Sequence, residues 1–264
     1  MESPEQRAAR HRRRATFGEI ADRYDRYRPG YAPSLVDALV ATARLRAAST
    51  VLEVGCGTGQ LAELLASRSL RVTALDVGTS MIAAARRRVG PGVVLHVSSF
   101  EDFDAAADAF DLVVSVDAFH WVDPEVRYEK ASHVLRSSGW LAVVLCDERY
   151  EEPLQGAIVS MWVARSEDGV AWWHTPKATV GEEIAASGCF GPVVESVHEW
   201  ELVRSPDEVV ELEATRATAL DWDAAARHRF SDELRAAIGG ERHLRMTRRA
   251  RLVMAQREGR RAGR

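Results

Sequence analysis

The stretch VLEVGCGTG, Val51–Gly59, decides the fold. Its first residues are β-branched and apolar, which is typical of a buried strand. Three glycines follow at alternate positions, and Gln60–Leu65 then has the spacing of an amphipathic helix. A strand, a glycine turn and a helix form the unit that brings backbone N–H groups close to a ligand at a helix N-terminus. An ordinary glycine turn would share this pattern, so other parts of the chain are needed to tell a ligand-binding loop from a simple turn.

The glycine spacing separates two classes of cofactor. The dinucleotide fingerprint G-x-G-x-x-G would need a third glycine at position 60, where the chain has Gln60, and this disfavours a nicotinamide oxidoreductase. The pattern E-x-G-x-G-x-G instead resembles the first motif of class I S-adenosylmethionine-dependent methyltransferases, in their small-molecule branch. The resemblance implies S-adenosylmethionine as cofactor and S-adenosylhomocysteine as product. It also implies that the loop residues hold the methionine portion, with Glu53 beneath them engaging its amino group: Gly55, Cys56, Gly57 and Gly59.

Asp76 ends the next predicted strand, about twenty residues beyond the first glycine. A carboxylate there can accept hydrogen bonds from both ribose hydroxyls, although it could instead cap the following helix. By resemblance to the family, Met81 packs on the adenine. Phe100 and Glu101, or Asp102, would meet the adenine edge after a strand over residues 92–97, unless the acids cap a helix beginning near Asp102.

The segment Ala109–Asp123 begins as an apolar strand and becomes polar and aromatic at its carboxyl end, the end that faces the ligand crevice in an open α/β sheet. It resembles the family's fourth motif in the form A-x-H-W-x-D, which implies that Asp117 contacts the cofactor. It lacks the Asp/Asn-Pro-Pro-aromatic tetrad of enzymes that methylate amino groups of nucleic acid bases. His120 is a candidate general base or a structural residue. Trp121 could form an apolar wall of the substrate site whose face attracts a cation.

The alternation of elements predicts an α/β fold with a doubly wound, mostly parallel, seven-stranded sheet of the Rossmann-like methyltransferase type. The fifth strand is expected over Trp140–Cys146, after a helix over Pro124–Leu135 and a turn at Ser138–Gly139. An antiparallel pair of last strands and a helical cap should complete the fold. The last strands are expected at Val193–Val203 and Met246–Ala255, and cap helices at Leu154–Arg165, Ser205–Ala219 and Asp223–Ile238.

The sequence predicts a basic tail over residues 1–15 and two lid helices over 16–45. A methyltransferase domain over 46–257 follows them. Aromatic residues and Arg28 near a turn suit either a lid over a carboxylate-bearing ligand or plain packing on the core. By resemblance, Tyr24 and Arg28 would contact the cofactor and Tyr31 the substrate. The cap is expected at about 148–192 and 205–240, and a second basic tail at 258–264.

Aromatic residues concentrate in the predicted cap. They are expected to shape an acceptor pocket, with His174 a second candidate base, although core packing explains each equally well. The residues concerned are Trp162, Trp172, Trp173, His174 and Trp222.

Composition limits the remaining possibilities. The chain has 264 residues and a net charge of −4, which gives no global attraction to nucleic acid. Its three cysteines lack metal-ligand spacing, so no metal is expected, and no apolar run reaches transmembrane length. We therefore expect a cytoplasmic enzyme that methylates an O, N or C atom of a small molecule. The alternatives are a non-methylating cyclase or isomerase that binds the same cofactor, and an RNA or protein methyltransferase supported only by the arginine-rich ends.

Overall fold

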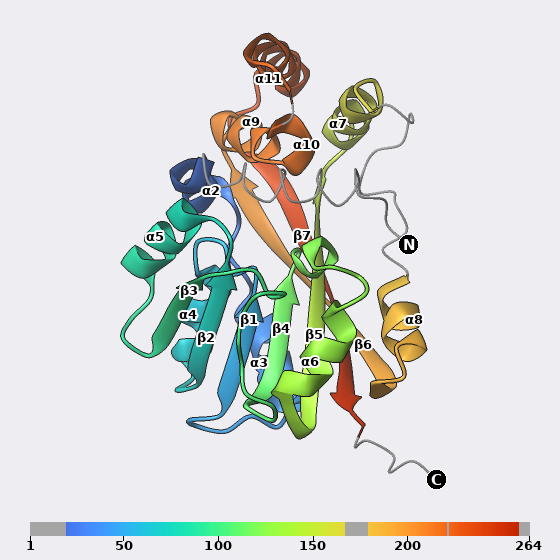
Figure 1. Ribbon diagram of the computed structural model, residues 1–264. Helices are drawn as coiled ribbons and strands as arrows, with labels where there is room; N and C mark the ends of the chain where they lie inside the picture. The colour runs from blue at the N-terminus through green and yellow to red at the C-terminus, as the bar shows by residue number, and fades with distance from the viewer. Residues whose placement is uncertain (1–19, 167–178, 221, 259–264) are drawn as a thin grey trace.

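A computed structural model describes residues 20–166, 179–220 and 222–258 and contains one seven-stranded sheet (Figure 1). The strand order is β3-β2-β1-β4-β5-β7-β6, and β7 runs antiparallel to both of its neighbours. The predicted α/β class, the mostly parallel sheet and the antiparallel closing pair are therefore confirmed. The strands are β1 (Thr50–Val54), β2 (Arg71–Asp76), β3 (Val93–Val97), β4 (Phe110–Val116), β5 (Leu135–Tyr150), β6 (Phe190–Arg204) and β7 (Leu244–Arg257).

Helices lie on both faces of the sheet and above its carboxyl edge (Figure 1). Those named here are α2 (Ala21–Tyr27), α3 (Pro33–Thr42), α4 (Gln60–Ala66), α5 (Thr79–Arg88), the 3-10 helix η2 (Phe119–Trp121), α6 (Arg127–Val134), α7 (Leu154–Val163), α8 (Thr179–Ala186), α9 (Pro206–Ala214), α10 (Ala217–Leu220) and α11 (Ala224–Ile238).

The central strands are buried on both faces, which explains why their sequences are almost continuously apolar. In β4 every residue except Asp111 is buried. Val51 pairs with Val72 of β2, and Leu52 pairs with Val113 of β4, in parallel register. One face packs against α3, α4 and α5, and the other against α6 and α8, through two separate apolar clusters. This double covering aligns the carboxyl ends of β1, β2 and β4 at one edge.

β5 is longer than predicted at both ends. The predicted turn at Ser138–Gly139 lies inside it as an irregularity, where the pairing with β4 jumps from Leu135 to Trp140 and Ser138 takes a φ of 65°. At the other end the strand continues beyond Cys146 because it pairs with β7 in a ladder from Trp140↔Gln256 to Tyr150↔Met246.

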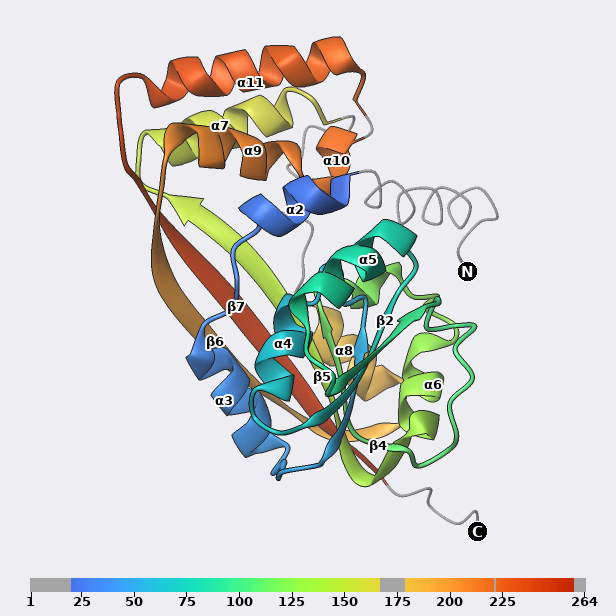
Figure 2. The same ribbon diagram turned by 90° about the vertical axis from the view of Figure 1, so that its left-hand side faces the viewer.

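The far ends of β5, β6 and β7 carry a cap made of α7, α9, α10 and α11 (Figure 2). These helices enclose their own apolar cluster, which includes Trp162, Phe230 and Leu234. The predicted cap segment 148–192 is wrong in one respect, because α8 packs on the sheet through the buried Ile184. Of the two lid helices predicted over residues 16–45, one belongs to the core instead. α3 buries Leu35, Val36 and Leu39 on the sheet, and of the two N-terminal helices in the described residues α2 lies at the lid position.

Side-chain capping explains the starts of two helices. Ser205 caps α9 through a reciprocal pair of hydrogen bonds with Glu208, and Asp223 caps α11. Two predicted starts are wrong. The helix expected from Pro124 begins at Arg127, and no helix forms near Asp102, whose backbone N–H and carboxylate bond to Ser99 instead. Among the helices of the described ranges, none is long and apolar enough to cross a lipid bilayer.

Candidate functional site

The glycine loop closes tightly onto β2 and η2. The N–H groups of Gly55 and Cys56 both donate to the carbonyl of Leu75, at 2.9 and 2.8 Å. Gly55 has a φ of +74°, and a Cβ there would lie 2.3 Å from the Cβ of Ala118. A side chain at this position would therefore clash with the start of η2 as well as strain the backbone.

The other two glycines have different surroundings. A Cβ on Gly57 would lie 3.8 Å from Cε1 of Tyr24, so this residue sits where α2 approaches the loop. Gly59 caps the start of α4 with a φ of +82°, and a Cβ there would lie 3.1 Å from Ala85 and Val89. Gly59 thus permits α4 and α5 to pack closely, and it does not line the pocket.

Asp76 is held at the end of β2 by backbone donors. One carboxylate oxygen accepts from the N–H of Gly57 at 2.9 Å, and the other accepts from the N–H of Gly78 at 2.8 Å. These bonds fix the carboxylate between the glycine loop and the turn before α5. The helix-cap alternative is not what the structure contains, because α5 begins after Gly78 without a side-chain cap.

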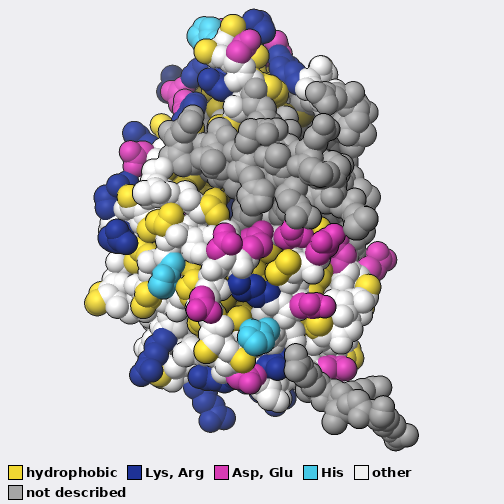
Figure 3. Space-filling model, viewed as in Figure 1, with side chains coloured by type: hydrophobic (Ala, Val, Ile, Leu, Met, Phe, Trp, Pro, Cys, Tyr) yellow, Lys and Arg dark blue, Asp and Glu magenta, His cyan; other side chains and the backbone are white. Residues whose placement is uncertain are grey.

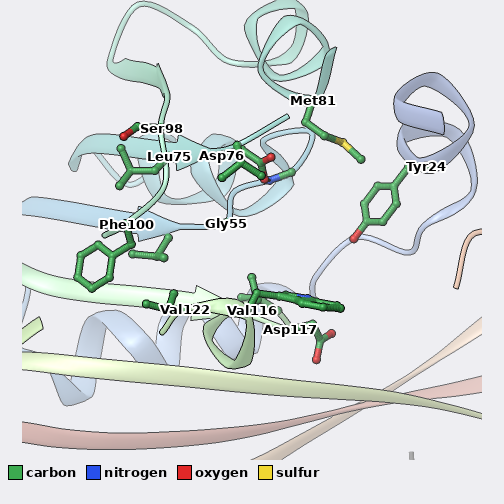
Figure 4. A pocket seen from close by; sticks show the side chains of 15 residues that line it. Tyr24, Gly55, Leu75, Asp76, Met81, Ser98, Phe100, Val116, Asp117 and Val122 are labelled. Carbon is green, nitrogen blue, oxygen red and sulfur yellow. The ribbon is translucent and has the colours of Figure 1, made fainter. Parts of the chain in front are cut away.

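A pocket opens at this edge, from Phe100 and Ser98 at one end to Tyr24 and Asp117 at the other (Figure 4). Sequence reasoning named about half of its lining and missed the apolar strand ends and the turn residues between them. Those it named are Tyr24, Gly55, Gly57, Asp76, Met81, Phe100, Asp117 and Trp121; those it missed are Val54, Leu75, Val77, Ser98, Val116, Ala118 and Val122. Each missed residue lies at or just beyond the carboxyl end of β1, β2, β3 or β4, which is the signal that would have found it.

Asp117 connects the pocket to the next strand. Its backbone N–H donates to Val144 at 2.9 Å, and one carboxylate oxygen accepts from the N–H of Cys146 at 2.8 Å. The residue takes a φ of 50°, an uncommon conformation for a non-glycine residue. These bonds turn the chain out of β4 and direct the carboxylate to the rim of the pocket.

Glu53 lies beneath the glycine loop and is only 3 % exposed. Its Oε2 is buried and has no hydrogen-bond partner. Burial, reinforced by the nearby charge of Asp76, raises the pKa of Glu53 to about 8. A buried acceptor without a donor is unusual, and it suits a ligand that brings a cationic donor to the loop.

Tyr24 closes the pocket from α2. The Arg28 guanidinium lies 5.0 Å from its ring centre, and burial raises the pKa of its hydroxyl while Arg28 opposes that shift. α2 is tied to α5 by the ion pairs Arg87–Asp22 and Arg88–Asp25, at 2.5 and 2.7 Å, and to α9 by Arg23–Glu211. Figure 2 shows α2 between these two helices, so it bridges the cofactor side and the cap.

Several predicted site residues lie away from the pocket lining. Arg28 donates to the hydroxyl and the carbonyl of Thr215, each at 3.0 Å, and Tyr31 lies against Arg248. Glu101 accepts from the backbone N–H of Asp123 at 3.0 Å, on the outer side of the turn.

The remaining predictions have different outcomes. Cys56, expected to hold the methionine portion of the cofactor, packs its side chain in the core and does not line the pocket, and burial raises the pKa of its thiol well above the usual range. His120 is exposed beside Trp121, with ring centres 5.0 Å apart, and does not line the pocket.

Trp162 and Trp222 pack against each other in the cap cluster, so the prediction that they shape an acceptor pocket is replaced by core packing. Trp172, Trp173 and His174 lie outside the described residues.

Comparison with known proteins supports the assignment that this geometry suggests. A family model described as a methyltransferase domain matches residues 51–139. An uncharacterized methyltransferase of Mycobacterium tuberculosis is 28% identical over 225 residues, which cover 84% of this chain and 85% of the relative. A malonyl-[acyl-carrier protein] O-methyltransferase of Enterobacter lignolyticus is 33% identical over 129 residues, 48% of this chain and 51% of that protein.

Among solved structures, a protein of Anaeromyxobacter dehalogenans described as a type II methyltransferase has the same fold, with a TM-score of 0.68. It is 24% identical, and the match covers 87% of this chain and 98% of that one. The glycine loop, the order of the strands and these relatives agree. Residues 51–139 thus match a methyltransferase domain, and the chain has the fold of the class I S-adenosylmethionine-dependent methyltransferases.

Proposed function

We propose that the pocket binds S-adenosylmethionine and that the protein transfers its methyl group to an O, N or C atom of a small molecule. The observation that carries this proposal is the unpartnered carboxyl oxygen of Glu53, which does not line the pocket but is buried beneath a loop that can accept no side chain at Gly55. An ammonium group is the donor such an oxygen lacks. When bound, S-adenosylmethionine supplies an electrophilic methyl group on a positively charged sulfur.

The lining residues fit the parts of this cofactor in order along the pocket. Phe100 offers an apolar face for an adenine, with Ser98 at the same end, and Met81 offers a second apolar face from α5. Asp76 would accept hydrogen bonds from the ribose hydroxyls. Gly55 and Gly57 would leave room for the methionine portion, whose amino group would be near Glu53. Tyr24 and Asp117 border the end at which the acceptor would enter.

The work of the protein in this reaction is alignment and exclusion of water. Tyr24 closes one side from α2, and Trp121 offers an aromatic face on the other. Such faces attract cations, and the carboxylate of Asp117 adds a negative charge at the same end. These groups would favour binding of a sulfonium and hold it in line with an incoming acceptor.

A small acceptor is favoured over a nucleic acid. The described part of the face in Figure 3 carries a band of acidic side chains, which an RNA backbone would avoid. The Enterobacter relative acts, by its name, on malonyl-[acyl-carrier protein] and not on a nucleic acid. The role of His120 as a general base stays a prediction, and it would matter only for an acceptor that must lose a proton.

The test measures by calorimetry how two nucleosides bind to the wild type and to variants. S-adenosylhomocysteine should bind the wild type, and Asp76→Ala should weaken that binding by about tenfold or more. Asp104→Ala, an exposed aspartate in the segment between β3 and β4, is the matched control and should bind normally.

Asp76 also anchors the loop, so the 2′-deoxy analogue separates the two roles. If Asp76 binds the ribose, removal of the 2′-hydroxyl should cost affinity in the wild type and almost nothing in Asp76→Ala. An equal loss in both proteins would show that Asp76 supports the loop alone, and failure of the wild type to bind S-adenosylhomocysteine would refute the proposed cofactor.

A further inference from the structure

Four charged side chains are buried together between the sheet and the cap. Glu148 of β5 lies 3.3 Å from Arg248 of β7 and 3.2 Å from Arg216, which follows α9. Arg216 also pairs with Glu213 of α9 at 2.6 Å. Exposure of these side chains is 7 % or less. Burying so many ions costs free energy that their mutual attraction does not always repay, so such a cluster invites a functional explanation.

With Arg28 included, three guanidinium groups accompany the two carboxylates of the cluster. Arg28 stands beside it, and its described hydrogen bonds go to Thr215 and to no carboxylate. Burial on its own would raise the pKa of Glu148. Yet Arg248, Arg216 and Arg28 together hold that pKa at about 2. Three guanidinium groups thus face the two carboxylates of Glu148 and Glu213.

The guanidinium of Arg248 has a donor that no group of the described protein accepts. One terminal nitrogen donates to the carbonyl of Pro29 at 2.8 Å, but its Nε is buried without a partner. The guanidinium lies between two aromatic rings, 5.3 Å from the centre of Tyr31 and 5.8 Å from that of Trp200. A planar cation fixed in this way offers the donor geometry that matches a carboxylate.

The cluster adjoins the acceptor end of the pocket. Arg28 lies over the ring of Tyr24, which lines the pocket. Asp117, which lines that end of the pocket, accepts a hydrogen bond from the backbone N–H of Cys146, two residues before Glu148 on the same strand. The charge of Arg248 acts on both Tyr24 and Asp117. An anion beside Arg248 would therefore lie next to the end of the pocket where the methyl group is expected.

The pocket also lacks a strong base. Among its described lining residues there is no histidine, lysine or cysteine, and burial raises the pKa of Tyr24, which keeps its hydroxyl protonated. An alcohol or ammonium acceptor would need to lose a proton before attack. A carboxylic acid is already ionised at neutral pH and needs no base.

We propose that the acceptor carries a carboxylate group, and that Arg248, with Arg28 beside it, binds that carboxylate between the cofactor pocket and the cap. This inference rests on the proposed methyltransferase function and names the chemical class of its acceptor. It gives Tyr31, which the sequence placed at the substrate, a supporting position against Arg248.

The experiment measures binding to the full chain loaded with S-adenosylhomocysteine. The probes are a graded series of aliphatic and aromatic carboxylic acids, each paired with its primary amide. At least one acid should bind about tenfold more tightly than its amide, because only the acid offers a charge to the guanidinium groups. If no acid exceeds its amide while S-adenosylhomocysteine binds normally, the inference is wrong and the proposed function stands.

Substitutions test whether Arg248 is the residue responsible for the preference for acids over amides. Arg248→Lys keeps a charge beside Glu148 but loses Nε and the planar fork, so it should lose most of the preference for acids and keep its affinity for S-adenosylhomocysteine. Arg68→Lys, which changes an arginine paired with Asp37 on α3, is the control. A preference that survives unchanged in Arg248→Lys would place the anion elsewhere. Should that variant not fold, the neutral pair Glu148→Gln and Arg248→Gln replaces it and is expected to lose the preference as well.

Discussion

The cofactor pocket and the cap differ in how their residues come together. The pocket is lined by strand ends, turns and α2, and most of its lining comes from residues 54–122. The cap assembles residues from 150 to 246 around one apolar cluster and rests on a buried ionic cluster. Local backbone geometry determines the first region. Long-range packing and charge pairing determine the second, so substitutions in the two regions should have separable effects on ligand binding and on stability.

The largest effect is expected in the cap. Glu213 is fully buried and accepts hydrogen bonds from Arg216, Trp162 and Tyr150. Glu213→Ala would leave the Arg216 charge poorly compensated and should lower the free energy of unfolding by about 3–5 kcal/mol, measured by urea denaturation. Glu233→Ala, which breaks an exposed pair with Arg165, should cost less than about 1 kcal/mol. Similar losses in both variants would contradict the proposed contrast between buried and exposed pairs.

The second-largest effect is expected for a substitution in the glycine loop. Gly55→Ala combines a strained positive φ with a clash against Ala118, and should cost about 2–4 kcal/mol of stability. It should also abolish detectable binding of S-adenosylhomocysteine, which Glu213→Ala should not do in conditions where that variant is folded. The control is Gly90→Ala, where the added Cβ meets nothing within 4 Å. Normal binding by Gly55→Ala would show that the loop tolerates a side chain.

Two buried glutamates give opposite pH dependences. Burial raises the pKa of Glu53 from 4.5 to about 8, so between these values the folded, ligand-free protein holds a proton that the unfolded chain has lost. The stability from this group is complete below pH 4.5 and falls as pH rises through 8. Glu148, with its pKa lowered to about 2, contributes stability that is lost only in acid.

Denaturation of Glu53→Gln at several pH values checks this prediction. The variant should show a flatter decline in unfolding free energy between pH 4.5 and 8 than the wild type. Identical slopes in the two proteins would mean that Glu53 is ionised in the ligand-free state. Wild-type binding of S-adenosylhomocysteine should also release protons in this range, because the ammonium group favours the ionised carboxylate.

The smallest effect is expected for His120, which stands exposed beside the pocket. For a carboxylate acceptor, His120→Ala should change the transfer rate by only a few-fold, since no proton has to be removed before attack. The control is His198→Ala on β6, an edge strand of the sheet. A fall of about a hundredfold or more would assign His120 as a general base and favour an alcohol or amine acceptor.

The sequence predicted the regions where local rules decide. Gly55 and Asp76 follow from the requirements of a strand–turn–helix unit, and the helix starts predicted at Ser205 and Asp223 are the positions whose side chains cap α9 and α11. It did not predict that Arg28 would bond to Thr215, because these residues are 187 positions apart and no periodicity joins them.

The cap was harder to predict for the same reason. Tryptophan is common in ligand pockets, so Trp162 was predicted to line one. In the folded chain its ring instead packs against Phe230, and its indole N–H donates a hydrogen bond to Glu213. The opposed charges of Glu148, Arg216 and Arg248 carry no spacing signal, since they come from three different elements.

The ladder between β5 and β7 has a consequence for how ligands enter. It pairs eleven successive positions, from Trp140↔Gln256 to Tyr150↔Met246, and passes without interruption from the sheet into the base of the cap. A hinge between cap and sheet would have to break those backbone bonds, so a swinging cap is disfavoured. The two ion pairs that hold α2 on α5, one exposed and one partly buried, are weaker than this ladder. Exchange of cofactor and product is therefore expected to depend on displacement of this one short helix, with the acceptor site keeping its shape from one turnover to the next.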